Sequence, residues 1–142
     1  MSGERLTIAD YPLAEKRPEI VRGKRGKGVD EITLQALVDN HVALEDLRIT
    51  ATALRQQAEI ARAAGRATLA ANFERGAELV DVPQDTIMRI YELLRPGRAQ
   101  SQEELLAAAR KLRDEHGAKG LAAFVEEAAA VYERRGLFKK RF

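Results

Sequence analysis

The sequence predicts an all-α protein, a compact bundle of about five short helices preceded by an extended N-terminal arm. Three observations support this fold class. Apolar or small residues recur at intervals of three and four from Thr50 to Pro96, which places them on one face of each helix. Capping residues and glycines divide the chain at the expected helix ends. Segments with the strict alternation of a half-buried strand are missing from the sequence.

The composition fits one domain with a modest core, because apolar residues make up 45% and charged residues 32% of the 142 residues. Aromatic residues reach only 5%, so we expect a core of alanine and leucine in which helices approach closely. The absence of cysteine excludes a disulfide framework and thiol chemistry. A net charge of +2 does not require a nucleic-acid partner, and no apolar run reaches the roughly 20 residues that span a bilayer.

Residues 1–32 form the predicted arm, in which Pro12 and Pro18 interrupt any helix. Its apolar residues lack a helical period, so we expect the arm to be disordered or to lie along another protein. The basic, glycine-rich run Arg22–Gly28 is interpreted as a mobile, solvated linker. A phosphate-binding loop is disfavoured there, because no strand precedes the run and no Ser or Thr follows a Gly-Lys pair.

The helical domain is expected over residues 33–136. Thr33 is predicted to cap a short helix that ends at Asp39. This helix is expected to turn three apolar side chains inward, namely Leu34, Leu37 and Val38.

Five main helices follow, and their ends are predicted from local signals. Gly65 and Gly117 are expected just past helix ends, because glycine tolerates positive φ. Pro83 suits the first turn of a helix, and Ser101 with Glu104 fits a capping box. The expected ranges are 50–65, 67–80, 83–95, 101–116 and 119–134. Residues 137–142 complete the chain as a basic C-terminal tail with two exposed aromatic residues.

Candidate catalytic and metal-binding residues do not emerge from the sequence. His41 and His116 are 75 positions apart, and neither lies at metal-ligand spacing from a suitable side chain. Ser101 is not part of a nucleophile elbow. Adjacent carboxylates such as Glu126 and Glu127 do not face each other on a helix, so they are not an acid–base pair. We therefore expect no catalytic, cofactor-binding or metal-binding residue on this chain.

Short runs of residues between Asp10 and about Arg135 together match the pattern of one protein family. They are Asp10–Ala14, Pro18–Glu19, Thr33–Leu34, Arg48–Thr50, Leu54–Arg55, Gln57–Ala58, Ile60–Ala61, Asn72–Arg75, Ala77–Leu79, Val82–Pro83, Ile90–Tyr91, Leu94–Pro96, Glu104–Ala107, Ala122–Val125 and Glu127–Ala128. In this order and spacing, the sequence resembles the small (gamma) subunit of adenosylcobalamin-dependent diol dehydratase and of the related glycerol dehydratase. The resemblance extends over nearly the whole chain.

The resemblance implies an enzyme of large, medium and small subunits, assembled as a dimer of heterotrimers. This lyase converts 1,2-propanediol, glycerol or ethane-1,2-diol to an aldehyde and water by a radical mechanism. The active site is expected in the large subunit, and adenosylcobalamin between the large and medium subunits. A helical small subunit would support the large one without supplying a catalytic residue. The implied location is the cytoplasm, and in some relatives a bacterial microcompartment.

Four residues are expected at the interface with other subunits, and each is equally suited to the core of the domain. They are Tyr11, Leu13, Phe73 and Tyr91. No nucleic-acid or membrane partner is expected. The alternative is a free-standing helical interaction module, or a nucleic-acid-binding regulatory module that uses the basic ends of the chain.

Overall fold

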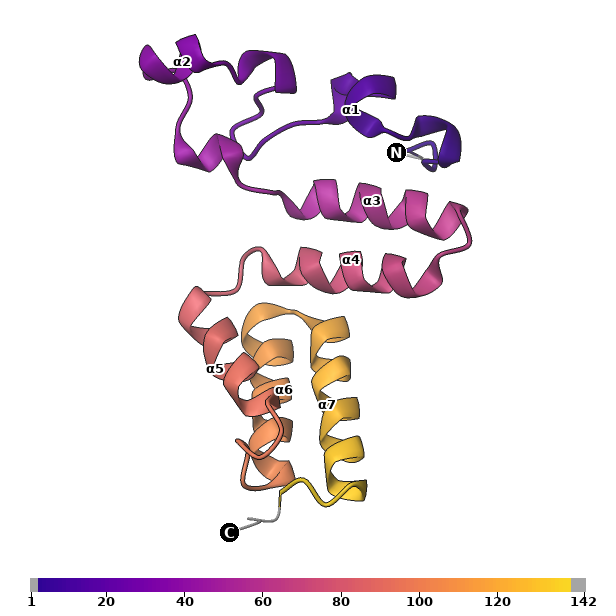
Figure 1. Cartoon of the computed structure of the whole chain (residues 1–142), viewed down its shortest axis with the longest axis vertical. Coiled ribbons are helices and arrows are strands. Elements are labelled where there is room, and N and C mark those ends of the chain that lie inside the picture. The colour runs from indigo at the N-terminus through magenta and orange to yellow at the C-terminus, as the bar shows by residue number, and fades with distance from the viewer. Residues whose placement is uncertain (1–2, 139–142) are drawn as a thin grey trace. The chain divides into compact units, whose positions relative to one another are not determined.

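The chain divides into two units, Met1–Val80 (unit 1) and Asp81–Phe142 (unit 2), and the computed structural model describes residues 3–138. Seven α-helices and four 3-10 helices make up this described part (Figure 1). Residues 3–138 contain no strand, and the one isolated bridge among them joins Arg22 and Gly28. The predicted all-α fold class is confirmed.

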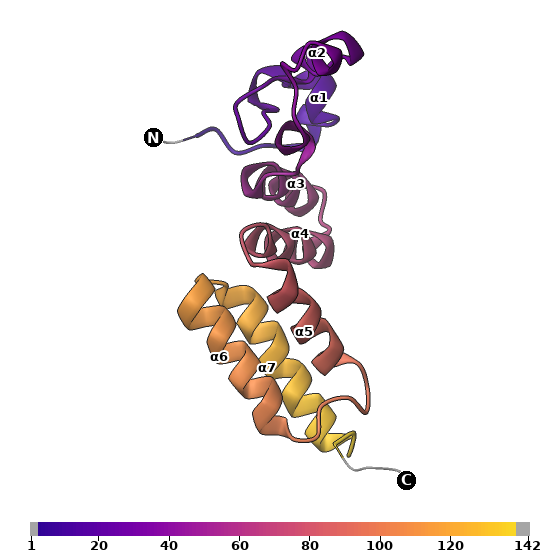
Figure 2. The same cartoon turned by 90° about the vertical axis from the view of Figure 1, so that its left-hand side faces the viewer.

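A helical hairpin forms the centre of unit 1. Helices α3 (Ala51–Ala63) and α4 (Ala67–Leu79) lie side by side in Figures 1 and 2. Thr50 caps α3, because its side chain accepts a hydrogen bond from a backbone N–H of the first turn. Gly65 then reverses the chain with a φ of 73°, a conformation that costs glycine little. Both ends of α3 lie within two residues of the predicted range 50–65.

Small residues let α3 and α4 pack closely. Three buried alanines meet between the helices, with Leu69 and Phe73 packed against them. The buried alanines are Ala58, Ala61 and Ala70. Because an alanine buries little apolar surface, this hairpin gains less hydrophobic stabilisation than one built on leucine and valine.

The N-terminal segment of unit 1 packs against α3. Its short helices are η1 (Ile8–Asp10), α1 (Leu13–Lys16) and η2 (Pro18–Ile20). Leu6 and Leu13 are buried in one cluster with Ile60 of α3. The backbone N–H of Leu6 donates a hydrogen bond to Glu59 at 3.0 Å. Leu6 and Leu13 of the predicted arm are therefore covered by a helix about fifty residues further along the chain, whereas Ile8 and Tyr11 are exposed.

The middle of unit 1 contains further short helices. They are η3 (Val29–Glu31), α2 (Leu34–Val38) and η4 (Leu44–Leu47). Thr33 caps α2 as predicted. The predicted inward direction of its apolar side chains is wrong, because Leu34, Leu37 and Val38 are 77%, 49% and 66% exposed. Their spacing places them on one side of the helix, but no other described part of the chain covers that side.

Three helices build unit 2, and their ends also lie within two residues of the prediction. They are α5 (Gln84–Leu94), α6 (Gln102–His116) and α7 (Lys119–Arg134). Helices α6 and α7 pack together as a hairpin joined at Gly117, whose φ is 63°. Ser101 caps α6 as predicted, but Glu104 accepts from the N–H of Gln100 instead of from Ser101. The reciprocal half of the predicted capping box is thus displaced by one residue.

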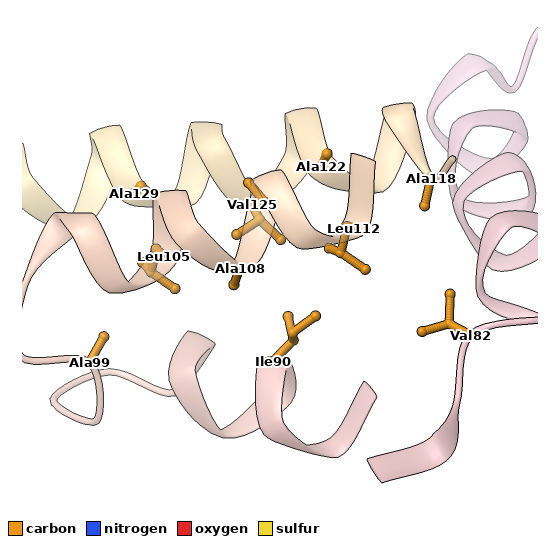
Figure 3. Close-up of a cluster of buried hydrophobic side chains, with 11 residues drawn as sticks. Val82, Ile90, Ala99, Leu105, Ala108, Leu112, Ala118, Ala122, Val125 and Ala129 are labelled. Carbon is orange, nitrogen blue, oxygen red and sulfur yellow. The ribbon is translucent and has the colours of Figure 1, made fainter. Parts of the chain in front are cut away.

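A continuous apolar core closes unit 2 (Figure 3). Leu105 and Leu112 of α6 and Val125 of α7 are fully buried. Alanines of the same two helices fill the space between them, while Ile90 of α5 and Val82 complete the cluster. The alanine- and leucine-rich core that the composition predicted is therefore present in this unit.

The C-terminal end of the described chain adds to this core. Phe138 packs on Tyr132 with the ring centroids 6.2 Å apart, and the Tyr132 hydroxyl donates to the Leu94 carbonyl of α5. The expectation of an exposed aromatic is wrong for Phe138, because Tyr132, six residues earlier in the chain, provides a partner ring. Residues 139–142 of the predicted basic tail lie outside the described residues.

Candidate functional site

Exposed aliphatic side chains concentrate in one stretch of unit 1. In α2, Leu34 and Val38 lie one helical turn apart on the same face. In η4, Leu44 and Leu47 are three residues apart, which aligns them on one side of a 3-10 helix, and they are 70% and 60% exposed. Single exposed leucines are ordinary, but a succession of them over two helices indicates an interaction surface. The aliphatic segment is defined here as Leu34, Leu37, Val38, Leu44, Leu47 and Ile49.

The backbone of the aliphatic segment is held in place although its side chains are exposed. Asn40 adopts a φ of 60° and ends α2, and the N–H of His41 donates to the Ala36 carbonyl at 2.8 Å. Val42, between the two helices, is only 5% exposed and anchors the connection in unit 1. The aliphatic side chains are therefore carried on an ordered backbone.

Asp46 of η4 has a fully buried carboxylate beneath this segment. Arg25 binds it with two hydrogen bonds, one from Nε to Oδ1 at 2.8 Å and one from Nη2 to Oδ2. The N–H of Ala43 donates to Oδ2 at 2.8 Å. Hydrogen bonds from Arg25, followed by the one from Ala43, lower the pKa of Asp46 to about 2.

The loop Arg22–Gly28 brings Arg25 to this carboxylate. The N–H of Gly23 donates to the Lys27 carbonyl at 2.9 Å and closes a tight turn. Gly23 also lies so close to η4 that an added Cβ would be 2.9 Å from the Asp46 carbonyl oxygen. The interpretation of this run as a mobile linker is wrong, because glycine allows the close approach and Arg25 has an acidic partner 21 residues away.

The four residues predicted as subunit contacts fall into two groups. Tyr11 and Tyr91 are 59% and 58% exposed. Leu13 is buried in the cluster that holds Ile60, and Phe73 packs against the alanines of the α3–α4 hairpin. Tyr11 belongs to unit 1 and Tyr91 to unit 2. Contact of any of the four with another subunit stays a prediction.

Sequence reasoning missed both the aliphatic segment and the Arg25–Asp46 pair. A signal for the first was present, since helices as short as α2 and η4 have too few residues to build a core of their own. For the pair no local signal exists. Its partners are far apart in the sequence, and neither has a spacing that distinguishes it from a solvated charge.

A surface hollow of about 540 Å³ in unit 1 is lined by acidic and basic side chains, among them Arg55. Its two carboxylates are already engaged. Glu59 accepts from the backbone N–H of Leu6, and Glu74 forms an ion pair with Arg62. The hollow therefore has the mixed, paired charges of a protein surface and does not present two free carboxylates for acid–base chemistry.

Over residues 3–138, no group of three or more His, Cys, Asp or Glu side chains is placed to hold a metal ion. Within the same range, every helix falls short of the length and apolar character needed to cross a bilayer.

Comparison with known proteins adds the family. A family model described as "Dehydratase small subunit" matches residues 6–139. The propanediol dehydratase small subunit of Citrobacter freundii is 49% identical over 138 residues, which cover 97% of this chain and 80% of the relative. The propanediol dehydratase small subunit of Salmonella typhimurium is 50% identical over 132 residues, covering 93% and 76%. The chain therefore belongs to the dehydratase small-subunit family.

Proposed function

We propose that this chain is the noncatalytic small subunit of a coenzyme B12-dependent diol dehydratase. Such an enzyme converts 1,2-diols, including 1,2-propanediol and glycerol, to aldehydes and water by a radical mechanism. One observation carries this proposal, the near 50% identity to two propanediol dehydratase small subunits over more than nine-tenths of the chain.

We assign the cofactor to the other subunits of the assembly. Adenosylcobalamin supplies the radical chemistry when it is bound, while protein positions and shields the substrate. The described residues here do not fit that group. The carboxylates of the unit 1 hollow are engaged, and Nε2 of His116 is a buried atom at the end of α6. We therefore propose that the contribution of this chain is structural.

Large and medium dehydratase subunits are the proposed partners, in a dimer of heterotrimers. Tyr11 and Tyr91 are proposed contacts, because both rings are exposed in the chain by itself. Leu13 and Phe73 are kept as predicted contacts, although most of their surface is used within unit 1. The proposed location is the cytoplasm, where a protein-shelled microcompartment can enclose the enzyme.

A free-standing nucleic-acid-binding module has less support. Arginines of the main helices pair with glutamates, as in Arg62–Glu74 and Arg113–Glu126. A surface that binds nucleic acid instead gathers one sign of charge on one face.

Coexpression of this chain with the large and medium subunits tests the proposal. We expect the three chains to purify together in equal amounts. Aldehyde formation should require all three chains and adenosylcobalamin, and the isolated small chain should be inactive. A fully active enzyme that lacks this chain would contradict the proposed function.

A further inference from the structure

We infer that the aliphatic segment is a preformed docking surface for the large dehydratase subunit, and that Arg25 is the residue that positions it. This inference rests on the proposed function and adds the place and the chemistry of the contact. The surface offers aliphatic side chains from two consecutive short helices, so the matching surface of the partner is an apolar recess with a polar edge.

The chemistry of the segment matches the centre of a stable interface. Its six side chains are between 49% and 77% exposed, and all are Leu, Ile or Val. Permanent subunit interfaces have apolar centres and bury roughly 800 Å² or more on each partner. Six large aliphatic side chains, on two consecutive short helices and the residue Ile49 after them, can supply the apolar centre of such a contact.

Polar residues border these side chains. Gln35 and Asp39 of the α2 region are exposed and joined by a side-chain hydrogen bond of 3.0 Å. Glu45 and Arg48 are exposed on either side of Leu47. An apolar centre with a polar edge of both charges is the arrangement found in specific protein interfaces.

The larger subunit fits this surface better than the other candidates. The chain belongs to a family of small subunits, so one stable contact with a larger subunit is required of it. Unit 2 closes its own core, and its described part exposes fewer large apolar side chains, namely Met88, Tyr91 and Phe124. A membrane surface would need a longer amphipathic helix than the five residues of α2.

Arg25 keeps the surface ready for the partner. It holds Asp46, whose carboxylate also accepts from Ala43 and so fixes the first turn of η4. Leu44 and Leu47 extend from that same turn. A surface that is already in its bound arrangement loses less entropy on docking, so binding is tighter. Loss of Arg25 should therefore weaken docking without removing a single aliphatic contact.

The test uses the full-length chain coexpressed with the large and medium subunits. The Leu34→Asp/Leu44→Asp double variant places a charge on each short helix at its first residue, where an acidic side chain is compatible with the helix. We expect at least a tenfold loss of the large subunit recovered with the small one. Val29→Asp is the matched control, since Val29 is 52% exposed and is the first residue of the short helix η3 but lies outside the aliphatic segment, and it should leave recovery unchanged.

The outcomes separate the two proposals. Normal recovery with the double variant would overturn the docking surface and leave the proposed function in place. Failure of the unaltered chain to bind any dehydratase subunit would overturn the proposed function itself. Self-association of the unaltered chain, abolished by the double variant while the assembly persists, would show that the segment binds a second copy and would also overturn the inference.

The positioning role has its own readout. Arg25→Ala should lower recovery several-fold and raise amide hydrogen exchange at residues 42–47 of the free chain, with exchange in α6 and α7 unchanged. Arg25→Lys should restore only part of the recovery and only part of the protection from exchange, because an ammonium group cannot reproduce the two parallel hydrogen bonds of the guanidinium. Full recovery with Arg25→Ala would remove Arg25 from the inference.

Discussion

Unit 1 and unit 2 are each built around a two-helix hairpin, but they place their large apolar residues differently. In unit 2, the α6–α7 hairpin buries Leu105, Leu112 and Val125 completely. In unit 1, the α3–α4 hairpin is packed on alanines, and the large aliphatic residues of α2 and η4 face outward. The first unit resembles one side of an interface, whereas the second resembles a small domain core.

An apolar stripe therefore predicts which side of a helix is apolar, but it does not predict whether the same chain or another subunit packs against that side. Both units contain such stripes, with the same spacing of three and four residues. In unit 2 the chain covers the stripe itself, while under our proposal a larger subunit covers the aliphatic segment of unit 1. The following predictions test the comparison, beginning with the largest expected effect.

Truncation of a leucine should lower the free energy of unfolding strongly in unit 2 and very little in α2. Leu112→Ala removes a fully buried side chain and should lower the free energy of unfolding by about 2–5 kcal/mol. Leu34→Ala, at a side chain 77% exposed, should change it by less than about 0.5 kcal/mol. Urea denaturation of the isolated chain measures both. Equal losses would contradict the contrast between a closed core and an open surface.

The next effect concerns Asp46 and pH. Its pKa is about 2 in the folded chain, below the ordinary value of 3.8, so the carboxylate is favoured by folding. Its stabilising contribution is complete above about pH 4–5 and is lost as the pH falls towards 2. Asp46→Asn should lower the urea midpoint of unit 1 at pH 7 and reduce the difference between pH 7 and pH 3.

Asp10 provides an internal background for that measurement. Its pKa is also lowered, first by the backbone N–H of Thr7 and then by Arg17, and it is unchanged in the variant. The difference between the two proteins therefore isolates Asp46. An identical pH dependence in both would show that the buried carboxylate does not stabilise unit 1.

The Tyr132 hydroxyl should make a smaller contribution to unit 2. Tyr132→Phe removes the hydrogen bond to the Leu94 carbonyl and should cost about 0.5–1.5 kcal/mol of unfolding free energy. Tyr91→Phe is the matched control, because Tyr91 is 58% exposed and should change stability by less than about 0.5 kcal/mol. Thermal unfolding of the two variants checks the prediction, which fails if they melt alike.

The last prediction is a small gain in stability from a substitution in unit 1. Gly76 lies inside α4, and a Cβ there would be 3.7 Å from Leu54, an ordinary contact distance. Gly76→Ala should stabilise the chain by about 0.5–1 kcal/mol through its higher helix propensity. Gly117→Ala should act in the opposite direction, because its φ of 63° is unfavourable for alanine. A loss of stability with Gly76→Ala would mean that the alanine-packed hairpin has no room for one more methyl group.

Helix ends were predictable because their signals are local. Thr33, Thr50 and Ser101 cap helices through hydrogen bonds to backbone groups three residues ahead. Gly65 and Gly117 adopt the positive φ that their residue type favours. Interactions that span so few residues are visible in a sequence window.

The candidate site was harder to predict. The resemblance to dehydratase small subunits indicated a partner, but the four residues chosen as contacts do not include the aliphatic segment. The sequence predicts Leu13 as a subunit contact and Leu34 as an inward-facing side chain, yet Leu13 is buried with Ile60 and Leu34 is 77% exposed. Arg25 lies in a run that the sequence predicts to be a solvated linker, although it donates a hydrogen bond to Asp46.

The helical class, the positions of the main helices and the family of this chain can be predicted from the order of its amino acids alone. Those properties depend on caps, helical periods and residue order, all of which can be read within one stretch of chain. Tertiary structure alone decided which apolar faces are buried and which charges are paired. Burial and ion pairing require two distant segments to meet, as Leu13 meets Ile60 and Arg25 meets Asp46, and no local pattern specifies that meeting.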